Sequence, residues 1–338
     1  MNNRYRSRQL VQRVIALSIS YERDNMLARG MRIEHLRELL QGIARQLIRH
    51  SANLAFAGHW QESDENFTYD LLQWINDERS SESVSGHGAA IGGMYNHLAW
   101  PDYLPVTPQL EAQWIHCCRI IRITQPLAGI SADSRVGDSL PLPSTDAVTL
   151  NSAIVLSAMR RIATEGMTLE IAGMPRDQFP KVPPLTARIF LGGKTTGYRG
   201  FLPGLFEEAL LGFERSIPMY ILGGFGGSAC ALSEALLAPK GRRTPELELE
   251  WHEEHTPQVK QLEALARQRP LPAGVRSSKE ALDALQARID AARRPSLASA
   301  LKTGLSEEDT IELMTTIDIR RAVSLCVKAL LPPVTDAS

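Results

Sequence analysis

The sequence lacks any hydrophobic run long enough to cross a membrane, which takes about 20 apolar residues. Its apolar N-terminal run, VIALSI at 14–19, is flanked by polar residues and is also too short for the core of a signal peptide. Of its 338 residues, 43% are hydrophobic and 22% are charged, as in ordinary globular proteins. We therefore expect a cytoplasmic protein without a membrane partner.

Cysteine is scarce, with four in the chain. Only Cys117 and Cys118 lie near each other, and adjacent cysteines fit neither a disulfide nor C-x-x-C metal spacing. The histidines and acids at 252–255 match neither H-E-x-x-H nor H-x-x-E-H, so a solvated helix face is expected there. We expect reduced thiols, no metal and no cofactor.

An excess of one charge sign is also missing, because the formal net charge is -1. Such a balance creates no global field that would recruit nucleic acid. We expect no nucleic-acid partner, and an anionic ligand would have to be captured by local groups.

What is present is an alternation of short apolar runs and helical patterns. Residues 14–18 and 53–57 predict strands, and each is followed by a predicted helix, at 33–48 and at 63–77. Further strands are indicated at 94–100 and 118–123, and a helix from 147 ends at Gly166 after a long connection. This order predicts an α/β fold, a Rossmann-like three-layer sandwich with a mainly parallel sheet.

Two strand-turn-helix units follow in close succession. In the first, ARIFLGG leads to the loop KTTGYRG and a helix opened by Pro203. Gly193-Lys194-Thr195 suggests a P-loop, but the glycine that this motif requires is Arg188, so the assignment fails. Cations, hydroxyls and free amides before a helix still suit a phosphorylated ligand, and the alternative is a solvated loop. The candidate ligand-binding residues here are Gly193, Lys194, Thr195, Arg199 and Gly204.

The second unit, PMYILGGFGGSA, places G-x-G-x-x-A between a strand and a helix. In that context glycines let backbone amides approach a phosphate. The alternative is a tight turn packed against a neighbour. The candidate ligand-binding residues are Gly224, Phe225, Gly226, Gly227 and Ser228.

Other candidates lie at the expected carboxyl ends of the first two strands, where open parallel sheets bind ligands. These are Ser18, Ser20, Arg23 and Gly58. Glu207 and Glu208 lie near the start of the helix after Pro203, about 100° apart around it, so at most one points squarely at a pocket. Such an acid would hold ribose hydroxyls, or act in cleaving an N-glycosidic bond, unless it only complements the helix N-terminus.

The C-terminal third changes character. We divide the chain into a nucleotide-binding domain at 1–240, a charged segment and linker at 241–276, and a C-terminal helical extension at 277–338. In the extension, Ser277 with Glu280, Ser306 and Asp318 are predicted to cap three helices.

The segments ALSIS, LAFAG, LGGKTTGYRGFLPGLFEEAL and PMYILGGFGGSACALSEAL resemble the SLOG superfamily. This Rossmann-like group includes the LONELY GUY and lysine-decarboxylase-like proteins. The closer likeness is to the branch that associates with TIR or nucleoside-phosphorylase effectors in bacterial antiviral systems. The resemblance implies a pocket lined by Lys194, Arg199, Glu207 or Glu208 and the 223–228 loop, and a nucleotide signal that drives homo-oligomerisation.

The likeness to LONELY GUY enzymes breaks at their P-G-G-x-G-T-x-x-E motif. The proline is replaced by Leu222, the threonine by Gly227 and the active-site glutamate by Cys230. This favours a nucleotide sensor that recognises a cyclic nucleotide or an NAD or ADP-ribose derivative and acts through a separate effector. The alternative is a nucleotide N-glycoside hydrolase using Glu207 or Glu208, and a structural assembly protein is a third.

Overall fold

The computed structural model describes residues 9–85, 92–137, 145–170, 173–239, 241–294 and 296–331. Within these ranges, six parallel strands form one sheet in the order β4-β3-β2-β1-β7-β8. Its strands are β1 (Val14–Ser20), β2 (Asn53–Phe56), β3 (Met94–Ala99), β4 (Cys118–Ile123), β7 (Ala187–Gly192) and β8 (Met219–Leu222). The expected parallel, Rossmann-like sheet is confirmed.

Helices connect the strands and extend beyond the last of them. They are α1 (Arg23–Ala28), α2 (Ile33–Arg49), α3 (Thr68–Ser85), α4 (Pro108–Trp114), α5 (Asp146–Glu165), α6 (Gly204–Arg215), α7 (Gly227–Leu237), α8 (Leu249–His255), α9 (Gln258–Gln268), α10 (Ser278–Ala292), α11 (Leu297–Leu301), α12 (Glu307–Thr315) and α13 (Ile319–Leu330). A short antiparallel pair, β5 (Met167–Thr168) and β6 (Lys181–Val182), follows α5. The helix at α5 ends at Gly166, as predicted, with a φ of 77°.

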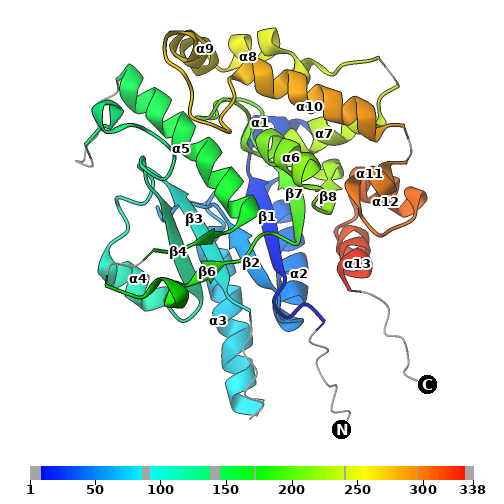
Figure 1. Cartoon of the computed structure of the whole chain (residues 1–338). Coiled ribbons are helices and arrows are strands. Elements are labelled where there is room, and N and C mark those ends of the chain that lie inside the picture. The colour runs from blue at the N-terminus through cyan, green and yellow to red at the C-terminus, as the bar shows by residue number, and fades with distance from the viewer. Residues whose placement is uncertain are drawn as a thin grey trace.

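The helices form a layer on each face of the sheet (Figure 1). Alternate side chains of β1 serve the two layers. Ile15, Leu17 and Ile19 join the core made with α2, α3 and α13. Ala16 and Ser18 point to the opposite face, where α5 and α6 pack and where α9 and α10 lie beyond them. The side chains on one face of β1 are therefore large and apolar, whereas those on the other face are small.

The sheet reverses its direction of growth at β1. From β1 the chain builds β2, β3 and β4 outward on one side, and it then returns to place β7 and β8 on the other. The carboxyl ends of β1 and β7 lie side by side at this reversal, and open α/β sheets bind ligands at such a place.

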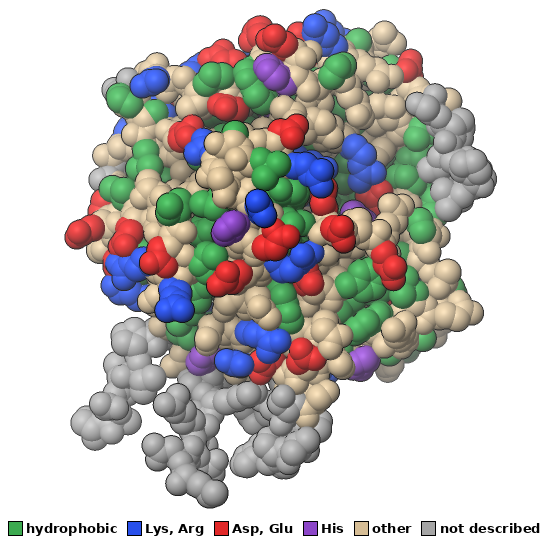
Figure 2. All heavy atoms as spheres, turned by 180° about the vertical axis from the view of Figure 1, so that it is seen from behind, with side chains coloured by type: hydrophobic (Ala, Val, Ile, Leu, Met, Phe, Trp, Pro, Cys, Tyr) green, Lys and Arg blue, Asp and Glu red, His purple; other side chains and the backbone are tan. Residues whose placement is uncertain are grey.

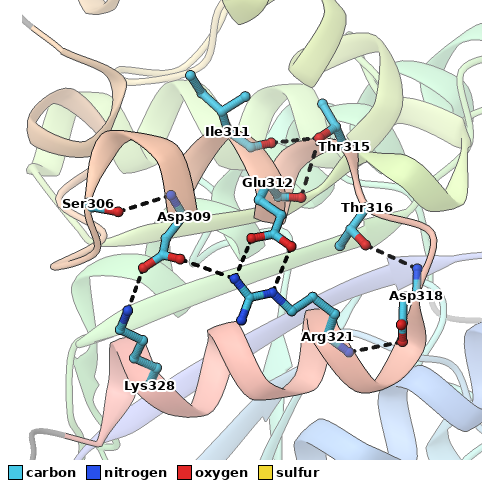
Figure 3. Close-up of polar contacts among 9 residues, drawn as sticks. All are labelled: Ser306, Asp309, Ile311, Glu312, Thr315, Thr316, Asp318, Arg321 and Lys328. Atoms are coloured by element: carbon cyan, nitrogen blue, oxygen red, sulfur yellow. Dashed lines mark hydrogen bonds and ion pairs between the residues drawn. The ribbon is translucent and has the colours of Figure 1, made fainter.

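The C-terminal helices pack against the sheet domain. Helix α12 contacts β8, α13 lies along α2, and Leu325 and Cys326 of α13 are buried in the core under the sheet. Side chains of Asp309 and Glu312 on α12 pair with Arg321 and Lys328 on α13 (Figure 3). The predicted caps are confirmed, because Ser277, Ser306 and Asp318 each accept an amide hydrogen bond at the start of a helix.

Two local expectations were wrong. The strand predicted at 14–18 was too short, since β1 continues to Ser20 and α1 begins at Arg23. The charged segment at 241–276 contains α8 and α9, and His252 is fully buried rather than solvated. The ring of His252 packs edge-on against its neighbour Trp251 and against Tyr198 and Phe206. The last two come from distant segments, which the charged sequence around His252 does not reveal.

Charge on the molecular surface is mixed. Acidic and basic side chains are interspersed over the face opposite to that of Figure 1 (Figure 2). No helix in the described ranges has the length and apolar character needed to cross a membrane.

Candidate functional site

A cavity of about 360 Å³ lies over the carboxyl half of the sheet at the reversal between β1 and β7. Space for this cavity remains above the sheet because the central strands carry small side chains there. In the parallel register, Arg188 of β7, Ala16 of β1, Ala55 of β2 and Tyr95 of β3 form one row across the sheet. The two alanines at the centre of that row leave a hollow between larger outer side chains.

Arg188 is the buried cation of this cavity, with only 3% of the residue exposed. One terminal nitrogen, Nη1, donates to Ser18 Oγ at 2.8 Å and lies 3.0 Å from Glu208 Oε1. The other, Nη2, donates to Thr164 Oγ1 at 3.0 Å. A buried ion pair held by further hydrogen bonds is a rigid element, so Arg188 joins β1, α5, β7 and α6 at the cavity wall.

The two neighbouring glutamates of α6 have different surroundings. Glu208 lines the cavity and pairs with Arg188, whereas Glu207 pairs with Arg160 of α5, its Oε2 lying 2.5 Å from Nη1. Of the two acids, Glu208 is therefore the one that faces the cavity.

The side of the cavity near α6 is rich in positive charge. Among the described residues that line it, Arg160, Arg188, Lys194 and Arg199 are cationic, and Asp102 and Glu208 are the only carboxylates. Gly204 also lines the cavity where α6 begins, and no described side chain caps that helix. Free amides and the helix dipole add to the attraction for an anion at such a terminus.

Arg160 and Arg199 are held in different ways at this side. The guanidinium of Arg160 lies against Gly200 and Gly204, where an added Cβ would approach it to 3.2 and 3.1 Å. Arg199 is exposed at the rim and forms a two-pronged contact with Asp102, at 2.8 and 2.5 Å.

The opposite side of the cavity, over β3, contains an uncharged polar side chain that makes fewer hydrogen bonds. His97 is 1% exposed, and neither of its ring nitrogens makes a hydrogen bond of normal geometry with the described residues. Its interaction with the backbone of Tyr95 only partly opposes the effect of burial on its pKa. Burial, with a smaller contribution from the charge of Arg188, lowers the pKa of His97 to about 4, so the ring is neutral at pH 7. The hydroxyl of Tyr198, on the loop after β7, is also buried without a hydrogen-bond partner among the described residues, and burial raises its pKa above the ordinary value.

The first predicted loop is held by a carboxylate of the chain itself. Glu22 Oε1 accepts hydrogen bonds from the amide and hydroxyl groups of both Thr195 and Thr196, at 2.9 to 3.0 Å. The amide of Lys194 donates to Ser20 Oγ at 3.1 Å, while the Lys194 side chain is exposed at the cavity.

The second predicted loop packs against its neighbours. A Cβ at Gly227 would approach the carbonyl oxygen of Gly193 to 2.3 Å, and one at Gly224 would approach that of Thr316 to 2.0 Å. The amide of Gly227 donates to Asn25 Oδ1 of α1 at 3.0 Å, and Ser228 Oγ donates to the carbonyl of Lys194 at 2.7 Å. Glycine is required here by close backbone packing.

The cavity brings together some of the predicted ligand-binding residues and leaves others outside its lining. The predicted residues that line it are Ser18, Ser20, Lys194, Arg199, Gly204 and Glu208. The predicted residues outside the lining are Arg23, Gly58, Gly193, Thr195, Glu207, Gly224, Phe225, Gly226, Gly227 and Ser228.

Five polar lining residues were not recognised in the sequence: His97, Asp102, Arg160, Arg188 and Tyr198. A signal existed for two of them, because His97 and Arg188 are ionisable residues inside parallel strands of the sheet. Such strands are buried on both faces, so a histidine or arginine within them needs a reason.

The described residues include no cluster of three or more His, Cys, Asp or Glu side chains arranged to hold a metal ion. Cys230, at the position of the LONELY GUY glutamate, donates to Glu234 Oε1 at 3.2 Å. Burial is the main cause that raises the pKa of Cys230 to about 12, so its thiol is not a nucleophile at neutral pH.

Fold and cavity define a Rossmann-like protein with a cavity at the reversal of its sheet. The family model of SLOG cluster2 matches residues 9–174 and 176–313, and the chain therefore belongs to this SLOG family. A search of curated proteins found no match.

Proposed function

We propose that this protein is a nucleotide sensor, and that the cavity at the sheet reversal binds an anionic nucleotide signal. One observation carries the proposal: four cationic side chains against two carboxylates line the cavity beside the uncapped start of α6. Three of the four cations already pair with carboxylates, Arg160 with Glu207, Arg188 with Glu208 and Arg199 with Asp102. The exposed Lys194 and the start of α6 therefore supply the net attraction for an anion. Membership in the SLOG family supports a nucleotide as that anion.

In this proposal Arg160, Lys194 and Gly204 contact phosphate oxygens and Glu208 accepts from ribose hydroxyls. Charged guanidinium groups and helix-terminal amides suit phosphate, and a carboxylate already fixed by Arg188 keeps acceptor capacity for a hydroxyl. The ligand class is a cyclic nucleotide or an NAD or ADP-ribose derivative, drawn from the resemblance to the TIR- and nucleosidase-associating branch.

The output of binding belongs to the proposal as well. Binding stabilises the oligomeric arrangement for which the ligand has higher affinity, and a homo-oligomer passes the signal to a separate TIR or nucleosidase effector. We place this activity in the bacterial cytoplasm, in antiviral defence.

The test is thermal unfolding with a panel of cyclic nucleotides, ADP-ribose, NAD and nucleoside monophosphates. A ligand at 100 times its Kd stabilises the fold by about 2.7 kcal/mol. We expect Lys194→Ala and Arg160→Ala to remove that stabilisation, and Lys260→Ala, an exposed lysine of α9, to retain it. Equal stabilisation of all three variants would contradict the assigned site.

A second function, N-glycoside hydrolysis, is favoured by the position of Glu208 within the cavity. Against it, the Glu208 carboxylate is already held in a buried ion pair, with Oε1 3.0 Å from Nη1 of Arg188, so that oxygen is engaged by the protein itself. Chromatography of the same incubations decides between the two functions. Free base released by the intact protein and lost in Glu208→Gln would make it a hydrolase.

A further inference from the structure

We infer that the cavity contains a base-reading subsite, in which His97 on β3 and Tyr198 on the loop after β7 hydrogen-bond the edge of a nucleobase. The inference rests on the proposed function and assigns the two ends of its ligand. The observation behind it is independent of the cationic side of the cavity.

Both side chains are buried polar groups without partners. His97 is 1% exposed and Tyr198 is 7% exposed, and both line the cavity. In folded proteins nearly all such groups are hydrogen-bonded, because burying an unpaired one costs about 1–3 kcal/mol. Two such groups in the lining of one cavity indicate that a ligand supplies their hydrogen-bond partners.

Their chemistry fits a base better than a phosphate. A neutral imidazole presents one donor and one acceptor, and a phenol also presents both. The edge of a nucleobase offers donors and acceptors side by side, whereas a phosphate offers acceptors alone. The apolar side chains of Leu156 and Met159 on α5 line the same cavity, and they suit the face of a flat ring.

The sheet order gives the ligand its direction. His97 lies on β3 and Arg188 on β7, with β2 and β1 between them. Neighbouring strands lie about 4.8 Å apart, so the two backbones are separated by about 14 Å. The cavity is thus long enough to have two chemically different ends, with the base over β3 and the phosphate at α6.

The experiment is calorimetric titration of the full chain with AMP, GMP, CMP and UMP, each compared with ribose 5-phosphate, which has no base. Tyr198→Phe removes one oxygen, and His97→Leu removes a polar group that has no described partner, so neither deletes a contact of the folded state. We expect each to weaken the preferred mononucleotide about 3- to 10-fold and to leave ribose 5-phosphate within 2-fold.

Arg160→Ala is the matched control, and it should weaken mononucleotides and ribose 5-phosphate by the same factor. If the intact protein binds mononucleotides but the His97 and Tyr198 variants lose no preference for them over ribose 5-phosphate, the base subsite is wrong and the proposed function stands. If the intact protein binds none of the five probes, the base subsite is overturned, and the proposed function is decided separately by its own panel of cyclic nucleotides, ADP-ribose and NAD.

Discussion

The cavity and the α12–α13 pair both rely on arginine-carboxylate contacts, yet the two regions place them in opposite environments. In the cavity, the side chain of Arg188 is 3% exposed and that of Glu208 is 11% exposed. On the helix pair, Arg321 is 42% and Lys328 is 62% exposed (Figure 3). Breaking a buried pair leaves a desolvated charge without a partner, whereas each member of a broken exposed pair is solvated by water. Arginine-carboxylate pairs therefore hold the cavity wall in place, whereas those between α12 and α13 contribute little to stability.

The largest effect should come from Arg188→Met. It leaves Glu208 buried without its cation and removes the donors to Ser18 and Thr164, so we expect the free energy of unfolding to fall by about 3–5 kcal/mol. Urea unfolding measures this change. Adding Glu208→Gln to the variant should recover part of the loss, because it removes the unpaired charge. A double variant as unstable as the single one would contradict the role of charge.

The second-largest effect should be a fall in the free energy of unfolding in acid. The pKa of His97 is about 4 in the folded state, against 6.5 in an unfolded chain. Between pH 6.5 and 4 the unfolded state therefore binds more protons, and stability falls as the pH falls through that window. The loss from this one residue is on the order of 3 kcal/mol. Urea unfolding at a series of pH values should show a shallower fall for His97→Leu, and an unchanged profile would contradict the buried neutral ring.

Glu22→Ala should have an intermediate effect. It removes the carboxylate that accepts from Thr195 and Thr196, so we expect a loss of about 1–2 kcal/mol and faster amide exchange at 195–196. Asp24→Ala, an exposed acid on the same short helix, is the control and should change neither measurement. Equal effects of both variants would mean that only the net charge of α1 matters.

The smallest effect should come from Arg321→Ala on the helix pair. Its contacts with Asp309 and Glu312 are solvent-exposed, and salt screens such pairs. We expect a slight drop in melting temperature that disappears at 1 M salt, measured by circular dichroism. A drop comparable with that of Arg188→Met would remove the distinction between the two regions.

Prediction from sequence worked where the signal was local. The short apolar run at 14–18 predicted a strand, the apolar spacing after Ile33 predicted a helix, and Ser306 and Asp318 predicted helix starts. Prediction failed at His252, because its burial depends on aromatic side chains from the segments at 198 and 206. The glycines at 224–227 were recognised as a turn, but not that Asn25 and the backbone of Thr316 lie against them.

By itself the sequence determined the parallel α/β architecture and the positions of the loops at the sheet reversal, since periodicity and capping depend on neighbours along the chain. Only the tertiary structure decided which polar groups meet. Strand register places Arg188 in the row of Ala16 and Ala55, and helix packing brings Glu208 to it. These partners are up to about 170 residues apart, so no local pattern specifies their contact, and the cavity exists only once the sheet has assembled.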